Sequence, residues 1–106
     1  MGINKNIKEE IINVIKKVFP FGEGEVYLFG SRARNDWDNQ SDWDLLILTE
    51  EPVNTQEKFA RYISPFAEIG WYTEEKINPI NYSREEWEKR KKTFFYHNVM
   101  RDAIKL

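Results

Sequence analysis

Two carboxylates one residue apart stand at the head of an apolar run in the middle of the chain. Asp42 and Asp44 are separated by a tryptophan, and four aliphatic residues (45–48) follow. Side chains alternate between faces along a strand, so we expect both carboxylates on one face, with Cα atoms about 6.5–7 Å apart. Carboxylates at this spacing can bridge two divalent metal ions about 3.5–4 Å apart. Taken alone, the pair is equally compatible with a solvated strand entry.

A glycine-serine turn precedes this pair by about a dozen positions. Gly30 lets the backbone bend sharply and approach a ligand closely. Ser31 can cap a following helix, whose free backbone N–H groups can hold a phosphate. Arg32 and Arg34 can either reach phosphates or pair with acidic neighbours. The turn alone is a weak signal, but a metal pair beside a phosphate cradle indicates nucleotide chemistry.

The composition limits which metals the chain can bind and which class of protein it can be. A chain of 106 residues predicts a single domain over 1–106, and 41% apolar with 15% aromatic residues is typical of a folded protein. Cysteine is absent and there is one histidine, which excludes thiolate sites and disfavours zinc. Any metal site must therefore use oxygen ligands, which favour Mg²⁺ or Mn²⁺.

The charge and the apolar runs predict where the protein acts. A net charge of −2 argues against strong nucleic-acid binding, because such domains are usually basic. No apolar stretch approaches the length of a membrane span, and residues 1–6 lack the apolar core of a signal peptide. These features predict a cytoplasmic protein without membrane contact.

The apolar periodicity predicts which elements carry these residues. We expect a helix over 4–19, then strands over 25–30 and 42–49 with a helical turn and a polar loop between them. These are followed by a helix over 54–64, a third strand over 66–73, a turn of helix or a loop over 74–80, and a C-terminal helix. Pro65 is expected to end the helix before the third strand. Ser83 and Glu86 form a capping box for the C-terminal helix, with a break near Thr93.

The resulting order, α-β-α-β-α-β-α, predicts an α/β (α+β) domain. We expect a small mixed sheet of at least three strands, flanked by helices. Glu68 lies in the predicted third strand with an apolar neighbour on either side, a costly place for a charge. It is the candidate for a third carboxylate, or else a partner for a lysine or arginine.

The segment 30–34, Gly-Ser-Arg-Ala-Arg, followed by Ser-Asp-Trp-Asp-Leu-Leu at 41–46, resembles the signature of the minimal nucleotidyltransferases. These are small relatives of DNA polymerase beta and kanamycin nucleotidyltransferase. The resemblance implies a nucleotidyltransferase-like fold that binds a nucleoside triphosphate with two Mg²⁺ ions. Asn35 stands where this family usually has glycine, and asparagine readily adopts positive φ.

The resemblance also implies a role for each candidate residue. The triphosphate would lie at Gly30 and Ser31, with Arg32 and Arg34 beside it, and Asp42 and Asp44 would ligate the metals. Glu68 would take the third acidic position, as a metal ligand or as the proton acceptor.

The predicted function is therefore Mg²⁺-dependent transfer of a nucleoside monophosphate, AMP from ATP in the first instance, to an acceptor hydroxyl. Relatives that resemble this chain are often antitoxins of a HEPN-domain toxin, so a tyrosine of such a partner is one expected acceptor. A second hypothesis is a catalytically weak module that binds its partner through an aromatic surface, drawn from Trp37, Trp71, Trp87 and residues 94–96. A third hypothesis, an enzyme acting on a small molecule such as an aminoglycoside, is disfavoured because no substrate-binding domain is present.

Overall fold

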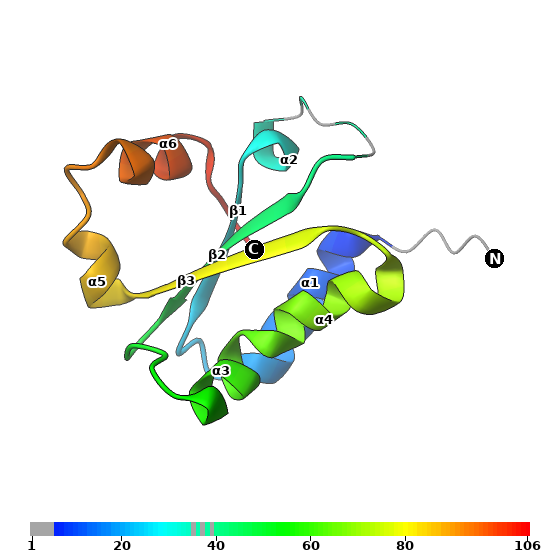
Figure 1. Ribbon diagram of the computed structural model, residues 1–106, viewed down its shortest axis with the longest axis horizontal. Helices are drawn as coiled ribbons and strands as arrows, with labels where there is room; N and C mark the ends of the chain where they lie inside the picture. Colours follow the sequence, from blue (N-terminus) through cyan, green and yellow to red (C-terminus); the bar gives the residue numbers. More distant parts are fainter. Residues whose placement is uncertain (1–5, 35, 37, 39) are drawn as a thin grey trace.

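A mixed four-stranded sheet forms the centre of the computed structural model, which describes residues 6–34, 36, 38 and 40–106 (Figure 1). The strands are β1 (Glu25–Phe29), β2 (Trp43–Thr49), β3 (Ile77–Ser83) and β4 (Ile104–Lys105). Their order in the sheet is β3-β2-β1-β4. β2 runs parallel to β3, whereas β1 is antiparallel to both β2 and β4.

Helices cover both faces of this sheet. On one face lie α1 (Ile7–Val18), α3 (Gln56–Tyr62) and α4 (Ser64–Thr73), and on the other α5 (Arg84–Glu88) and α6 (Phe94–Asp102). The short helix α2 (Ser31–Arg34) lies at one end of β1 and β2. This arrangement confirms the predicted class, a small mixed sheet flanked by helices.

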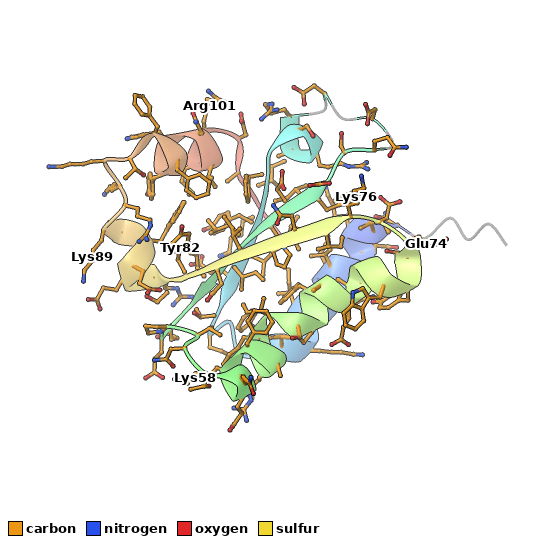
Figure 2. All side chains as sticks on the ribbon, viewed as in Figure 1. Lys58, Glu74, Lys76, Tyr82, Lys89 and Arg101 are labelled. Atoms are coloured by element: carbon orange, nitrogen blue, oxygen red, sulfur yellow. The ribbon has the colours of Figure 1, made fainter. Side chains whose placement is uncertain are left out.

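Strand β2 separates two hydrophobic cores because its side chains alternate between two covered faces. Leu45 and Ile47 face α1, α3 and α4, in a core that also contains Ile11, Phe19, Val26, Leu28, Ile63, Phe66 and Ile69. Leu46 and Leu48 face α5 and α6, in a core with Trp87 and Val99. Figure 2 shows Tyr82 of β3 on this second side, where it packs against the same core. A central strand covered on both faces explains the continuous apolar run.

Several predicted boundaries are confirmed within a few residues. The first helix begins at Ile7 after its cap Asn6, and residues 4 and 5 lie outside the described residues. Strands β1 and β2 each agree with their predicted ranges to within one residue. The capping box of Ser83 and Glu86 is present, and the C-terminal helix is interrupted, with Thr93 capping α6.

The predicted strand over 66–73 is wrong, because this segment is helix α4. Ile63, Phe66 and Ile69 are buried at three-residue intervals, as on one helical face. In a strand, Ile69 and Trp71 would share one face, but Ile69 is fully buried and the Trp71 side chain is 79% exposed. Pro65 does not end a helix. It stands in the first turn of α4, where its missing N–H costs nothing.

The true third strand, β3, begins inside the segment 74–80, which was predicted to be a turn of helix or a loop. Its sequence, Ile-Asn-Pro-Ile-Asn-Tyr-Ser, is rich in residues that strands usually lack. Pro79 is tolerated because β3 is an edge strand that pairs only with β2. The two-residue strand β4 was not predicted either. Among the described residues, no helix is both long and apolar enough to cross a membrane.

The helical assignment of residues 64–73 predicts opposite effects for two aromatic residues. Phe66→Ala is expected to lower the free energy of unfolding by about 3–5 kcal/mol, because this side chain is fully buried. Trp71→Ala, its matched control, is expected to change the free energy by less than about 0.5 kcal/mol. Urea unfolding of both variants measures the difference. A larger loss for Trp71→Ala would restore the strand assignment.

Candidate active site

The two aspartates lie at the beginning of β2, at the end of the sheet that carries α2. Asp44 pairs in register with Phe29, the last residue of β1, and with Asn78 of β3. It lies on the same side of β2 as Leu46 and Leu48, the face covered by α5 and α6. Asp42 directly precedes the strand and is exposed, while Asp44 is half-buried. The structure thus brings the carboxylate pair beside the turn that follows β1.

Gly30 forms this turn and lies against Asp44. Its φ of +76° is in the left-handed region that favours glycine. A Cβ atom at this position would overlap Asp44 Oδ2. The Gly30 carbonyl accepts hydrogen bonds from Ala33 N (3.0 Å) and Arg34 N (3.2 Å), which begin helix α2. Gly30 of the glycine-serine turn is therefore in direct contact with the second aspartate.

Helix α2 begins directly after Gly30, the residue that contacts Asp44. Ser31 is its first residue, and the N–H groups of Ala33 and Arg34 donate to the Gly30 carbonyl. At the start of a helix, the first N–H groups have no carbonyl partner within the helix. Such groups favour a negatively charged ligand. This arrangement is compatible with the predicted phosphate site, whose ligand contacts stay a prediction.

The environment of Asp44 disfavours its charged form. Burial raises the pKa of the Asp44 carboxyl above its usual value, and the nearby negative charge of Asp42 raises it further. The hydrogen bond from Asn78 Nδ2 to Asp44 Oδ1 (3.0 Å) and the positive charge of Arg34 act in the opposite direction but do not cancel these effects. The negative charge of the pair is thus incompletely compensated. The oxygen donors of Asp42 and Asp44 fit a hard divalent cation, which would supply the missing compensation.

The structure does not bring a third carboxylate to this pair. Glu68 lies on α4 with its side chain exposed, and its predicted place in a third strand is wrong. Strand β3 contains no aspartate or glutamate, and the residue beside Asp44 is Asn78. Over the residues that the structure describes, no group of three or more His, Cys, Asp or Glu side chains could hold a metal ion. Asn78 was not anticipated, because the sequence around it lacks the apolar pattern of a strand.

Arg34 lies near the aspartates and is held by two other acids. Its Nε donates to Asp36 Oδ2 (3.1 Å) and its Nη1 to Asp102 Oδ2 of α6 (3.3 Å). These hydrogen bonds raise the pKa of Arg34. Hydrogen bonds from Arg101 first, and then from Arg34, lower the pKa of Asp102. The sequence-based alternative that the arginines pair with acidic neighbours is therefore confirmed for Arg34. Its phosphate contact stays a prediction, and Asn35 lies outside the described residues.

Arg32 makes different contacts and is nearly buried, with a side chain that is 7% exposed. Its Nη2 donates to the Ser41 carbonyl (3.2 Å) and lies 3.5 Å from Glu75 Oε1. Its guanidinium stands 4.5 Å from the centre of the Trp43 ring. These contacts tie α2 to the beginning of β2, while the phosphate contact predicted for Arg32 stays untested.

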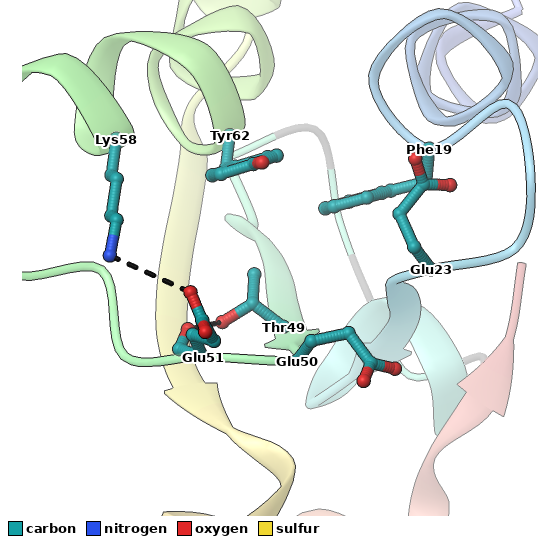
Figure 3. A pocket seen from close by; sticks show the side chains of 7 residues that line it. All are labelled: Phe19, Glu23, Thr49, Glu50, Glu51, Lys58 and Tyr62. Atoms are coloured by element: carbon teal, nitrogen blue, oxygen red, sulfur yellow. Dashed lines mark hydrogen bonds and ion pairs between the residues drawn. The ribbon is translucent and has the colours of Figure 1, made fainter.

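A separate pocket lies at the opposite end of β2, beside Thr49 (Figure 3). Its volume is about 240 Å³, and one wall is the stacked pair of Phe19 and Tyr62. The three glutamates that line it already have partners: Glu23 accepts from Phe21 N, Glu50 pairs with Arg84, and Glu51 pairs with Lys58. Two of its carboxylates, those of Glu50 and Glu51, are therefore each paired with a cation.

Comparisons with known proteins agree with the nucleotide chemistry that this geometry suggests. Residues 8–100 match the family model described as a nucleotidyltransferase domain. A protein from Methanocaldococcus jannaschii, named "Putative protein adenylyltransferase MJ0141", is 41% identical over 56 residues, 53% of this chain. The matched part covers 52% of that relative, so the match spans about half of its length.

Two solved structures share the fold at low sequence identity. One is a crystal structure of a toxin–antitoxin with AMP-PNP, with a TM-score of 0.64 and 14% identity, over 97% of this chain and 72% of that one. The other is described as a "putative minimal nucleotidyltransferase", with a TM-score of 0.58 and 23% identity, over 99% of this chain and 100% of that one. At these identities the likeness concerns the fold.

The raised pKa of Asp44 predicts that the ionised carboxylate destabilises the fold. The folded state holds this proton more tightly than the unfolded state, so stability falls as pH rises from the usual aspartate pKa through the raised one. Asp44→Asn removes the charge but leaves an oxygen that can accept from Asn78. It should be more stable than wild type at pH 7, with the difference disappearing near pH 3.

Urea unfolding at the two pH values measures this difference, with Glu57→Gln on the exposed face of α3 as control. An Asp44→Asn variant less stable than wild type at pH 7 would show that the carboxylate is well compensated.

Proposed function

Because the chain belongs to the nucleotidyltransferase domain family, we propose that it transfers a nucleoside monophosphate from a nucleoside triphosphate to an acceptor hydroxyl. The observation that carries this proposal is the contact between the Gly30 turn and Asp44. This contact places a candidate phosphate site next to a carboxylate pair whose negative charge is incompletely compensated. ATP is the proposed donor, in keeping with the adenylyltransferase name of the Methanocaldococcus relative.

In this proposal the chain binds and orients the reactants. The first N–H groups of α2 hold triphosphate oxygens, and Arg34, close enough to influence Asp44, contributes positive charge. Asp42 and Asp44 hold the divalent cations. Bound Mg²⁺ would neutralise charge on the α-phosphate and the leaving pyrophosphate, and would lower the pKa of the attacking hydroxyl. The acceptor oxygen forms a bond to the α-phosphorus, the bond to the pyrophosphate oxygen breaks, and the hydroxyl proton passes to water or a carboxylate.

The proposed acceptor is a tyrosine hydroxyl on a partner protein, in the first place a HEPN-type toxin. The fold is shared with a toxin–antitoxin that was crystallised with AMP-PNP, and the motif at 30–46 resembles that of antitoxin-type relatives. In this proposal the phenolic oxygen of such a tyrosine is the attacking group.

Asn78 favours a second candidate, a module that binds a partner and transfers nucleotide weakly or not at all. An amide beside Asp44 gives the site two negative charges where a third carboxylate would give three, and fewer charges bind a divalent cation less tightly. The exposed aromatic side chains of Trp71 and Phe94 add apolar surface that a partner can cover. In this version the chain neutralises its partner by contact alone.

Label transfer tests the first candidate. Incubation with α-labelled ATP, Mg²⁺ and a candidate acceptor should label the acceptor, and Asp42→Asn/Asp44→Asn should reduce labelling by at least about 100-fold. Asp44→Asn is expected to fold, so lost labelling reports chemistry. No labelling by wild type, or equal labelling by the double variant, would contradict the proposal. A partner still inhibited by the double variant without nucleotide would establish the second candidate.

Asn78→Asp distinguishes a weakened metal site from no metal site. The new carboxylate should tighten Mg²⁺ or Mn²⁺ binding about tenfold and raise the transfer rate, because it adds charge directly beside Asp44. Without metal the variant should be less stable than wild type, through repulsion with Asp44.

Titration calorimetry with Mn²⁺ measures the change in affinity, with Asn13→Asp on the exposed side of α1 as the matched control. Weaker metal binding by Asn78→Asp would place the cation elsewhere.

A further inference from the structure

Trp43 separates the two aspartates in sequence and lies on the opposite face of the sheet. It packs against the core formed with α1, α3 and α4, whereas Asp44 faces the side of α5 and α6. Contacts that hold Trp43 in place therefore also hold the neighbouring backbone of Asp42 and Asp44 in place. The Trp43 side chain contacts Arg32 of α2 and Glu75.

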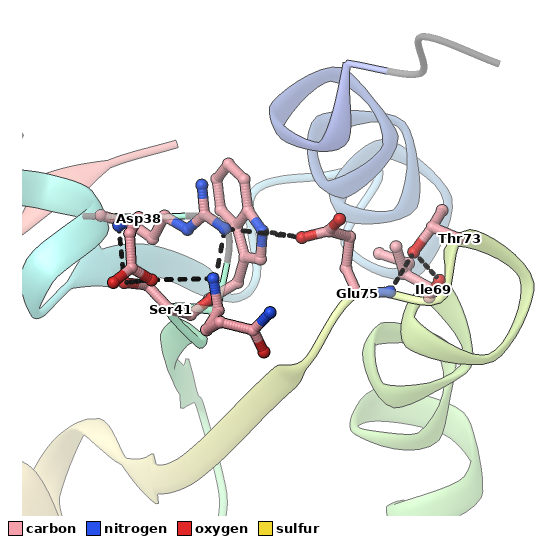
Figure 4. Close-up of polar contacts among 8 residues, drawn as sticks. Asp38, Ser41, Ile69, Thr73 and Glu75 are labelled. Atoms are coloured by element: carbon pink, nitrogen blue, oxygen red, sulfur yellow. Dashed lines mark hydrogen bonds and ion pairs between the residues drawn. The ribbon is translucent and has the colours of Figure 1, made fainter. Parts of the chain in front are cut away.

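Glu75 joins Trp43 to Arg32. Its Oε1 accepts a hydrogen bond from Trp43 Nε1 (3.0 Å) and lies 3.5 Å from Arg32 Nη2 (Figure 4). The Arg32 guanidinium stacks on the Trp43 ring and donates to the Ser41 carbonyl, one residue before Asp42. Charge-assisted hydrogen bonds of this kind are stronger and more directional than neutral ones. The Glu75 carboxylate thus connects α2, the helix of the candidate phosphate site, with Trp43, which stands between Asp42 and Asp44.

The turn between α4 and β3 is built to present Glu75. Glu74 adopts a left-handed φ of 61°, and Thr73 Oγ1 accepts from Glu75 N (3.4 Å) while donating to the Ile69 carbonyl (2.5 Å). A Cβ at Gly70 would lie 2.7 Å from the Glu75 carbonyl oxygen, so glycine lets the turn pack against α4. Figure 2 shows Glu74 and Lys76 at this turn, on either side of Glu75 in sequence.

The same turn also contacts the backbone of β2. Trp43 N donates to the Lys76 carbonyl (2.7 Å), and two residues later Asn78 reaches Asp44. Residues 75–78 therefore hold the beginning of β2 through side chain and backbone together.

We infer that Glu75 is a positioning residue, which acts through Trp43 and Arg32 to hold Asp42 and Asp44 in the arrangement that binds a divalent cation. This inference rests on the proposed function. Removing residues that orient the metal ligands without contacting the metal typically weakens metal binding by about 10–100-fold. Arg32 serves in this assembly to fix the tryptophan and the Ser41 carbonyl.

The test measures Mn²⁺ affinity by calorimetry in the presence of a non-hydrolysable ATP analogue, on the full chain, with urea unfolding in parallel. Glu75→Ala and Trp43→Phe should each weaken Mn²⁺ binding by about tenfold or more. Glu75→Gln keeps an oxygen for the indole N–H and should lie between Glu75→Ala and wild type. Glu57→Ala, a surface glutamate on α3, is the matched control and should leave Mn²⁺ affinity unchanged. In the transfer assay, kcat should fall while the KM for nucleotide stays near that of wild type.

The outcomes separate this inference from the proposed function. Unchanged Mn²⁺ affinity in folded Glu75→Ala and Glu75→Gln overturns it, even if their unfolding free energy falls, because the cluster then only stabilises the fold. If wild type binds Mn²⁺ but labels no acceptor, and Glu75→Ala binds Mn²⁺ more weakly, the transfer proposal fails and the positioning role stands. Should Glu75→Ala not fold, Glu75→Gln and Trp43→Phe decide by the same measurement. Wild type that binds no Mn²⁺ overturns both.

Discussion

The alternation of β2 between two packed faces is the constraint on which the rest of the site depends. Leu45 and Ile47 bury against α1, α3 and α4, and Leu46 and Leu48 bury against α5 and α6. A slip of one residue would turn the Asp44 carboxylate toward the first core and remove Trp43 from it. This fixes Asp44 on one face and Trp43 on the other. The apolar core thus determines where the carboxylates point, and the polar contacts at the end of the strand refine it.

The negative charge of the aspartates at this end of the sheet lowers the stability of the fold. Asp44 loses hydration beside Gly30 and faces the negative charge of Asp42, and the contributions of Asn78 and Arg34 do not cancel that cost. Active sites commonly retain such strain because the uncompensated charge is what binds the ligand. The close approach of Gly30 to Asp44 brings the candidate phosphate and metal sites into contact. This contact and the positive φ of Gly30 both disfavour a larger residue at position 30.

The sequence predicted the parts of the molecule that local rules determine. The helix start at Ser83, the strands β1 and β2, and the turn at Gly30 all follow from capping, alternation and glycine conformation. The parts that depend on distant partners were missed. The residues of α4 show alternation by coincidence, and only packing of Phe66 against the sheet decides for a helix. β3 lacks strand propensity and exists because it pairs with β2, so Asn78 was not recognised and Glu68 was chosen in its place.

The proposed site for metal and nucleotide is the space between the aspartate pair and the turn at Gly30 and Ser31. Anomalous scattering from crystals grown with Mn²⁺ and a non-hydrolysable ATP analogue tests this location. We expect Mn²⁺ density bound by Asp42 and Asp44, with the triphosphate at the start of α2. Nucleotide and Mn²⁺ bound elsewhere, with both aspartates free of metal, would contradict this proposal.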